Sequence, residues 1–329
     1  MKNEKRLVLI DGHAILYRAY HALPKLTTSK GELVNAVFGF CSMLLKIRDE
    51  LCPSFFAVSF DLPKPTFRNK LFANYQAQRP KMPDELSSQI EKIKEVIKTL
   101  QIPIYEQEGY EADDVIGTLA KQALANTKGV NSRQPLRLTS VNEVIIVTGD
   151  RDLLQLVNEQ TKVYMLIKGL TEATLYDEAK VEEKYGLESK QIPDYKALIG
   201  DPSDNYPGVS GIGPKTARDL LQCFKTIEQT YKNLDRVDKK IKDKLDEGKE
   251  QAVLGRKLAT IVTDVPVSLD LAKSKVETFN TPKVRKLFEE LEFKSLIPRL
   301  AEKGNNPGAA KVPKEKETKN SEQIRLFLG

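Results

Sequence analysis

Three short apolar runs, each followed at once by an acidic residue, limit the folds that this chain can adopt. The runs are RLVLI (6–10), SFFAVSF (54–60) and EVIIVTG (143–149). Continuous apolar runs of this length are typical of strands that are buried on both faces, as in a parallel sheet. Helical patterns lie among these runs near 33–51, 84–100 and 112–126. We therefore predict βαβ units and an α/β fold with a mostly parallel central sheet and flanking helices.

Acidic residues stand where these predicted strands end. Asp11 and Asp61 follow the first two runs, and Asp150 and Asp152 follow the third. Ligands of open α/β sheets bind outside the carboxyl ends of the strands, so we expect these acids to meet at one rim. Further acids that we expect there are Glu111, Asp113 and Asp114, at the start of the 112–126 helix, and the pair Asp201 and Asp204.

The number of acids favours a metal site over helix capping. A single Asp at a helix start satisfies most of the capping requirement, and three acids within residues 111–114 exceed it. Like charges gathered in a low-dielectric cleft repel one another unless cations neutralise them. The chain has only two histidines and three scattered cysteines, so the predicted ligands are carboxylate oxygens, which suit Mg²⁺ or Mn²⁺. Two such ions would activate a water and stabilise the leaving oxygen of a phosphodiester.

A second motif, PGVSGIGPKTARDLL (207–221), favours contact with nucleic acid. Glycines permit a tight turn, Pro suits the first turn of the following helix, and free N–H groups at a helix N-terminus bind phosphate. This helix–hairpin–helix pattern grips a nucleic-acid backbone without reading bases, although an ordinary joint between two helices is the alternative. The residues that we assign to the contact are Gly211, Gly213, Lys215 and Thr216.

Charge and composition narrow the class of protein. The chain carries 52 Lys and Arg against 46 Asp and Glu, a net charge of +6 that suits a polyanionic partner without proving one. No stretch approaches the roughly 18 apolar residues of a membrane span, and the N-terminus reads as a strand instead of a signal peptide. Scattered cysteines fit a reducing compartment. We expect a cytoplasmic protein.

Together these motifs resemble the 5′ nuclease domain of bacterial DNA polymerase I, in the flap endonuclease family. The resemblance runs from LVLIDGHAILYRAYHALP through FDLPKPTFRNKLFANYQAQRP, GYEADDVIG and VTGDRDLLQL to LIGDPSDNYPGVSGIGPKTA. It implies a PIN-like nuclease core and a stand-alone 5′-3′ exonuclease or flap endonuclease that hydrolyses branched DNA, leaving a 5′-phosphate. The implied role is Okazaki-fragment maturation and repair.

The resemblance also implies a ligand set for two Mg²⁺ ions, which Mn²⁺ can replace. Around one ion it places Asp11, Asp61, Glu111, Asp113 and Asp114, and around the second Asp150, Asp152, Asp201 and Asp204. A potassium ion is implied at backbone carbonyls of the hairpin, within residues 207–213.

An arch over threaded single-stranded DNA is implied at about 63–83, a stretch that is basic from 67 onward. Arg18 and Arg79 are the implied catalytic cations near the phosphate, with Arg68 as a further DNA contact. Tyr75 either stacks on a base or packs against the arch's own helix. Where the family reads Tyr-Lys-x-x-Arg, this chain has Gln76, which donates a hydrogen bond but brings no charge. Lys70 and Lys81 are the candidate substitutes.

We nevertheless expect an active enzyme, because a chain without catalysis has little physical reason to keep nine mutually repelling acids. One alternative is a non-catalytic module that binds branched DNA. The other is a ribonuclease of the same fold that removes RNA primers.

The predicted domains are a nuclease core over 1–175 and a helical region over 176–300, with the hairpin motif at about 195–222. Residues 126–140 should form an exposed loop, and 301–320 a disordered linker. The terminal segment 321–329 carries Gln323, Leu326 and Phe327 in a pattern that resembles the peptide by which bacterial replication proteins bind the sliding clamp. The alternative is a short helix that folds back onto the nuclease, or a frayed end.

Overall fold

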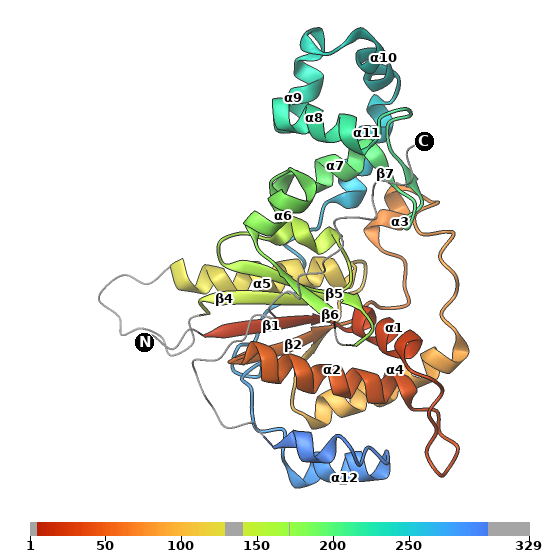
Figure 1. The fold of residues 1–329 in the computed structure, drawn as a ribbon, viewed down its shortest axis with the longest axis vertical. Coiled ribbons are helices and arrows are strands. Elements are labelled where there is room, and N and C mark those ends of the chain that lie inside the picture. Colours follow the sequence, from red (N-terminus) through yellow and green to blue (C-terminus); the bar gives the residue numbers. More distant parts are fainter. Residues whose placement is uncertain (1–4, 129–140, 171, 302–329) are drawn as a thin grey trace, which may run out of the picture.

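The structure is a computed structural model that describes residues 5–128, 141–170 and 172–301. Most of the predicted 126–140 loop, nearly all of the 301–320 linker and the whole 321–329 peptide lie outside the described residues. A central sheet lies between two layers of helices, and a separate group of helices lies beyond one of these layers (Figure 1). Among the described helices, none combines the length and apolar character needed to cross a bilayer.

The sheet has six strands in the order β3-β2-β1-β4-β5-β6. The strands are β1 (Arg6–Asp11), β2 (Phe55–Ser59), β3 (Ile104–Tyr105), β4 (Glu143–Thr148), β5 (Thr161–Lys168) and β6 (Glu172–Tyr176). All neighbours are parallel except β5 and β6. The mostly parallel sheet and its three predicted central strands are confirmed. The other three strands were not predicted, since β3 is too short to leave a pattern and β5 and β6 carry polar residues toward the sheet's edge.

Alternate residues of the central strands enter two separate cores. From β1, Val8 and Ile10 pack under the first layer, whereas Leu7 and Leu9 pack under the second. This two-sided burial explains why the strand reads as an unbroken apolar run. The first layer consists of α1 (Gly12–Ala22), α2 (Asn35–Leu51), α4 (Asp84–Thr99) and, outermost, α12 (Pro282–Glu290); the second is α5 (Ala112–Lys128).

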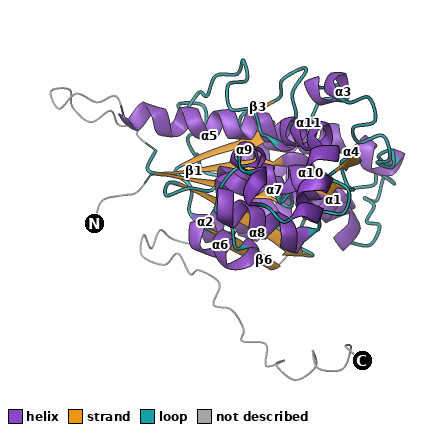
Figure 2. Ribbon diagram, turned by 90° about the horizontal axis from the view of Figure 1, so that it is seen from above, coloured by secondary structure: helices purple, strands orange, loops and turns teal. Residues whose placement is uncertain are grey.

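The remaining helices form a region with its own apolar core. They are α6 (Glu178–Tyr185), α7 (Ile192–Ile199), α8 (Pro214–Phe224), α9 (Ile227–Lys232), α10 (Lys239–Glu247) and α11 (Lys249–Ala259), with short 3-10 turns at Ser189–Gln191 and Leu234–Arg236. Two other 3-10 turns, at Asp152–Leu156 and Ile297–Leu300, pack into the cores beside the sheet. Figure 2, which looks onto this end of the molecule, shows α7 to α10 in front of the strands.

A tight hairpin joins α7 to α8. Two short antiparallel strands, β7 (Gly200–Asp201) and β8 (Tyr206–Pro207), bring the backbones of Gly200 and Gly208 together. A Cβ on Gly208 would lie 2.3 Å from the Gly200 nitrogen, so a side chain there would force the hairpin open. Within 63–83 the helical part is short: α3 (Phe67–Leu71) is followed by turns.

Candidate metal centre and active site

A cavity of about 1100 Å³ opens at the rim where the carboxyl ends of β1, β2 and β4 meet the N-terminus of α5. Strand order explains the convergence, since β1 lies between β2 and β4 and all three are parallel. The cavity is lined by seven of the nine predicted carboxylates, namely Asp11, Asp61, Glu111, Asp113, Asp150, Asp152 and Asp204. Asp114 and Asp201 do not line it.

Asp11 belongs both to a helix cap and to the cavity. Its Oδ1 accepts a hydrogen bond of 3.0 Å from the Ala14 N–H at the start of α1, and its Oδ2 accepts one of 2.8 Å from the Thr148 hydroxyl. Burial and the nearby charge of Asp61 raise the pKa of Asp11 to about 6. Thr148, which sequence reasoning missed, also accepts from the Asp150 N–H at 2.9 Å and so ties the ends of β1 and β4 together.

The acids at the start of α5 carry negative charge that the protein compensates poorly. Burial, followed by the charges of Asp150, Asp11 and Asp61, raises the pKa of Asp113 well above its usual value. Burial also raises the pKa of Glu111 to about 7, although the charge of Arg68 opposes the shift. Crowded carboxylates whose ionised forms are this costly are the environment that a bound divalent cation would relieve.

Asp61 lies beside His13, a residue that was not among the predicted site residues. His13 Nδ1 lies 3.1 Å from Asp61 Oδ2, and Asp61 Oδ1 accepts a 2.8 Å hydrogen bond from the Ala112 N–H. Burial would raise the pKa of Asp61, but the hydrogen bond and charge of His13 outweigh it, so the pKa is lowered. The position of His13, two residues after Asp11, was the signal that sequence reasoning could have used.

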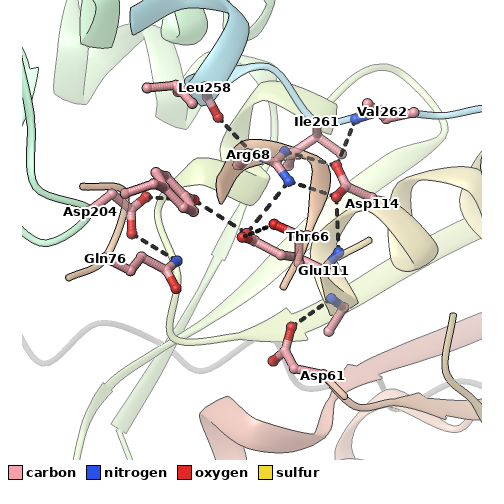
Figure 3. A network of polar contacts seen from close by, with 12 residues as sticks. Asp61, Thr66, Arg68, Gln76, Glu111, Asp114, Asp204, Leu258, Ile261 and Val262 are labelled. Atoms are coloured by element: carbon pink, nitrogen blue, oxygen red, sulfur yellow. Dashed lines mark hydrogen bonds and ion pairs between the residues drawn. The ribbon is translucent and has the colours of Figure 1, made fainter. Parts of the chain in front are cut away.

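Asp114 lies away from the cavity in this conformation, so its expected place among the metal ligands stays a prediction. It is 0% exposed, and its two oxygens accept hydrogen bonds of 2.7 and 2.8 Å from the Arg68 guanidinium (Figure 3). The same carboxylate accepts from the backbone N–H groups of Glu111 and Val262. With both oxygens engaged, Asp114 turns away from the cavity.

Arg68 lines the cavity, but its guanidinium is engaged in the same pair with Asp114, and its role as a DNA contact stays a prediction. Arg68 is 3% exposed, and besides Asp114 it donates to the carbonyls of Leu258 and Thr260 at 2.8 and 3.0 Å. Its guanidinium therefore ties α3 to α5 and to the end of α11 (Figure 3). In this conformation the guanidinium is held by protein partners.

Asp152, Asp201 and Asp204 form a second group, with one oxygen from each lying within 4.8 Å of the others. Lys196 of α7, which sequence reasoning did not single out, enters this group: its Nζ contacts Asp152 Oδ1 and lies 2.5 Å from Asp201 Oδ2. Burial and Asp150 raise the pKa of Asp152 to about 7 against the charge of Lys196. For Asp201 the charge of Lys196 outweighs burial, and the pKa is lowered.

The segment after α3 lies directly against Asp204. Arg79 donates to Asp204 Oδ1 at 2.8 Å and the Gln76 amide does so at 3.1 Å, while the Gln76 N–H donates to the Asp204 carbonyl at 2.9 Å. Gln76 adopts a positive φ of 57°, which lets its backbone and side chain reach the same residue. Figure 3 shows Gln76 turned toward Asp204.

Tyr75 packs into the protein, but mainly against β8 and α11 and not against a helix of the predicted arch. It is 4% exposed and shares a small apolar cluster with Tyr206 and Leu258. Its hydroxyl lies 3.3 Å from Glu111 Oε2 and 3.3 Å from Asp204 Oδ2, so it connects the two acidic groups. Tyr75 still lines the cavity, and its role as a DNA contact stays a prediction.

The other predicted contacts separate into two places. Arg18 lines the cavity and donates to the Leu166 carbonyl at 2.8 Å. The hairpin residues Gly211, Gly213 and Lys215 are exposed and Thr216 is half-buried, all within the separate helical region. Lys244 of α10 donates to the Gly211 carbonyl at 3.1 Å. None of these four residues lines the cavity, although Asp204, in the turn between β7 and β8, does.

The donor set of the cavity fits hard divalent cations. Its acidic groups offer only carboxylate oxygens, and burial raises the pKa values of Asp11, Glu111 and Asp152 to about 6, 7 and 7. Oxygen ligands in such number suit Mg²⁺ or Mn²⁺.

Comparison with known families and proteins gives a consistent result. Residues 6–186 match the family described as 5′-3′ exonuclease, N-terminal resolvase-like domain, and residues 187–282 match the 5′-3′ exonuclease, C-terminal SAM fold. DNA polymerase I of Bacillus subtilis (strain 168) is 43% identical over 303 residues, which cover 92% of this chain and 33% of that protein. DNA polymerase I of Caldicellulosiruptor bescii is 42% identical over 297 residues, covering 90% and 33%. The chain thus spans about a third of the length of these relatives.

Solved structures share the fold at lower sequence identity. T5 5′-exonuclease with bound divalent metal ions (zinc) has a TM-score of 0.59 and 20% identity, covering 78% of this chain and 89% of that one. The catalytic core of Rad2 in complex with DNA substrate has a TM-score of 0.54 and 18% identity, covering 91% and 93%.

Proposed function

Because this chain belongs to the 5′-3′ exonuclease family and is therefore a nuclease, we propose that it hydrolyses DNA phosphodiesters at 5′ flaps and 5′ ends. The observation that supports this most is the cavity of about 1100 Å³ with seven carboxylates at the rim of a parallel sheet. Its place in the cell would be Okazaki-fragment maturation and repair, in the cytoplasm.

Two divalent ions, Mg²⁺ in the first instance, complete the proposed site. Asp11, Asp61, Glu111 and Asp113 would hold one, while Asp152, Asp201 and Asp204 would hold the other. Asp150 stands between the groups, since its charge raises the pKa values of both Asp113 and Asp152. Such ions would lower the pKa of an attacking water and neutralise charge on the phosphodiester oxygens.

The protein's own cations have separate tasks in this proposal. Arg18 and Arg79 both line the cavity and would bind the phosphate on either side of the reacting bond. Arg79 is half exposed at 52%, so it is free to exchange its carboxylate partner Asp204 for a phosphate. Gln76 would position Asp204 without adding charge, and so does not replace the lysine expected from the family pattern.

The helix–hairpin–helix residues at the start of α8 would hold the DNA duplex at a distance from the cavity. Gly213 caps α8 without a side-chain hydrogen bond, and Pro214 occupies the first turn, so backbone N–H groups stay open to phosphate. Gly211, Lys215 and Thr216 complete this contact with the DNA backbone. A potassium ion within 207–213 remains part of the proposal, and the ammonium of Lys244 already holds the Gly211 carbonyl there.

Cleavage of end-labelled 5′-flap DNA with Mg²⁺, beside the same flap made of RNA, tests this function. The DNA flap should be cut near its base, and EDTA should stop the reaction. Faster cutting of the RNA flap would favour the primer-removing ribonuclease. Binding of both flaps without cutting would favour the non-catalytic module.

A sliding-clamp contact through 321–329 is a further part of the proposal, although that segment lies outside the described residues. A peptide covering 318–329 should bind the host's clamp with micromolar affinity by calorimetry. In the whole chain such a tether would raise the nuclease's effective concentration at a junction. Leu326→Ala with Phe327→Ala should abolish that binding and leave clamp-free flap cleavage unchanged. An absence of binding at high micromolar peptide would contradict the proposal.

A further inference from the structure

The second acidic group contains a cation of its own. Lys196 reaches it from α7, with its side chain only 19% exposed, and its ammonium stands between Asp152 Oδ1 and Asp201 Oδ2. These carboxylates are two of the three that lie close enough together to hold an ion. Burial alone would lower the pKa of Lys196, but Asp152 and Asp201 reverse this and hold it above its usual value.

Two further oxygens of this group accept hydrogen bonds from the protein. Asp201 Oδ1 accepts from the Ser203 N–H at 2.8 Å and from its hydroxyl at 2.6 Å. Asp204 Oδ1 accepts from Arg79 and Gln76. Two cations, Lys196 and Arg79, thus already face this group, whereas the charges that raise the pKa of Asp113 all belong to acids. An ion that enters the second group must therefore displace a positive charge, whereas one that enters beside Asp113 only relieves repulsion.

We propose that Lys196 is an internal counter-ion that occupies the second metal position, so that the second divalent ion binds only when the ammonium leaves Asp152 and Asp201. The inference rests on the two-metal site of the proposed function. In the metal-free protein the ammonium prevents Asp152 and Asp201 from repelling each other. During loading it makes the second ion bind more weakly than the first, so the two ions bind in order.

A place for the displaced ammonium lies close by. Tyr206 is buried, and within the described part of the chain its hydroxyl has no hydrogen-bond partner. The charge of Lys196 is among the influences on the pKa of Tyr206, which marks the two groups as neighbours. A phenol oxygen accepts a hydrogen bond from an ammonium, and the lysine side chain has a flexible four-carbon stem with which to move.

Calorimetric titration of the full chain with Mn²⁺, in the absence of DNA, tests the competition directly. Wild type should bind one Mn²⁺ ion with higher affinity and a second with lower affinity. Lys196→Met should tighten the weaker ion at least about tenfold, which corresponds to about 1.4 kcal/mol, and leave the tighter one unchanged. Lys196→Arg keeps the charge and should bind the weaker ion as wild type does.

Lys190→Met is the matched control, because Lys190 is exposed and pairs with Glu188 outside the cavity. It should leave both Mn²⁺ affinities unchanged. Lys196→Gln provides a second neutral variant should the methionine variant be unfolded without metal. In both neutral variants the melting temperature should fall in EDTA and rise with Mn²⁺ by more than in wild type.

Two results overturn the inference. If the weaker ion binds Lys196→Met and Lys196→Gln no more tightly than wild type, Lys196 is not a competitor. If neither wild type nor the neutral variants bind a second ion, the two-metal site fails as well. Flap cleavage by wild type distinguishes these cases from a failure of the nuclease function.

Discussion

Asp150→Asn should lower the single-turnover rate of flap cleavage by roughly a hundredfold to a thousandfold, the scale on which lost electrostatic stabilisation acts. Asp150 lines the cavity between the two acidic groups. An asparagine has the same shape, and its side-chain oxygen can still accept the 2.8 Å hydrogen bond from the Asp152 N–H. The substitution therefore removes charge and leaves the local fold in place.

Flap binding should stay equal or become slightly tighter, because one fewer carboxylate repels the DNA phosphates. Asp264→Asn, at an exposed position, is the matched control and should cut at the wild-type rate. Asp204→Asn should lose cleavage as well, since it weakens a proposed ligand and the partner of Arg79. Undiminished turnover in both Asp150→Asn and Asp204→Asn at low millimolar Mg²⁺ would exclude the two-metal site.

Asp114→Asn should lower the free energy of unfolding by about 3–5 kcal/mol, because it leaves the Arg68 guanidinium buried without its charged partner. That guanidinium is 3% exposed and links α3, α5 and the end of α11. Urea unfolding in EDTA is the right measurement, because it removes any contribution from bound metal. Arg68→Met should cost a similar amount.

In the double variant Arg68→Met with Asp114→Leu, the free energy of unfolding should fall by less than the sum of the two single effects, since neither charge is left unpaired. Asp84→Asn, in the first turn of α4, is the control, and its free energy of unfolding should fall by no more than about 1 kcal/mol. If Asp114→Asn instead had wild-type stability in EDTA and bound Mn²⁺ more weakly, Asp114 would act as a metal ligand.

The central strands and their acidic ends were predictable because the information is local. Because β1, β2 and β4 are buried on both faces, their sequences are unbroken apolar runs. Parallel strands bring their carboxyl ends to one rim of the sheet. Asp11, Asp61 and Asp150 follow from these two facts. The start of α5 joins them because its acids immediately precede an apolar helical pattern.

Long-range partners were not predictable in the same way. Arg68 and Asp114 are 46 residues apart, and nothing near either residue shows that they form a buried bidentate pair. Tyr75 and Asp204 are 129 residues apart, yet the tyrosine hydroxyl bridges Asp204 and Glu111. For Lys196 a local signal existed, five residues before Asp201, but an isolated lysine in a helix is usually a solvated charge.

The sequence by itself determined the class of fold, the rim at which the acids meet and the oxygen-only chemistry of the site. These follow from apolar periodicity, from the geometry of parallel strands and from residue type. Only the tertiary structure decided which acids are free to bind a cation. That depends on whether a carboxylate meets a guanidinium, as Asp114 does, an ammonium, as Asp201 does, or other acids, as Asp113 does. Such partners are fixed by closeness in space, and the Arg68 partner of Asp114 lies 46 residues away, so local sequence does not identify them.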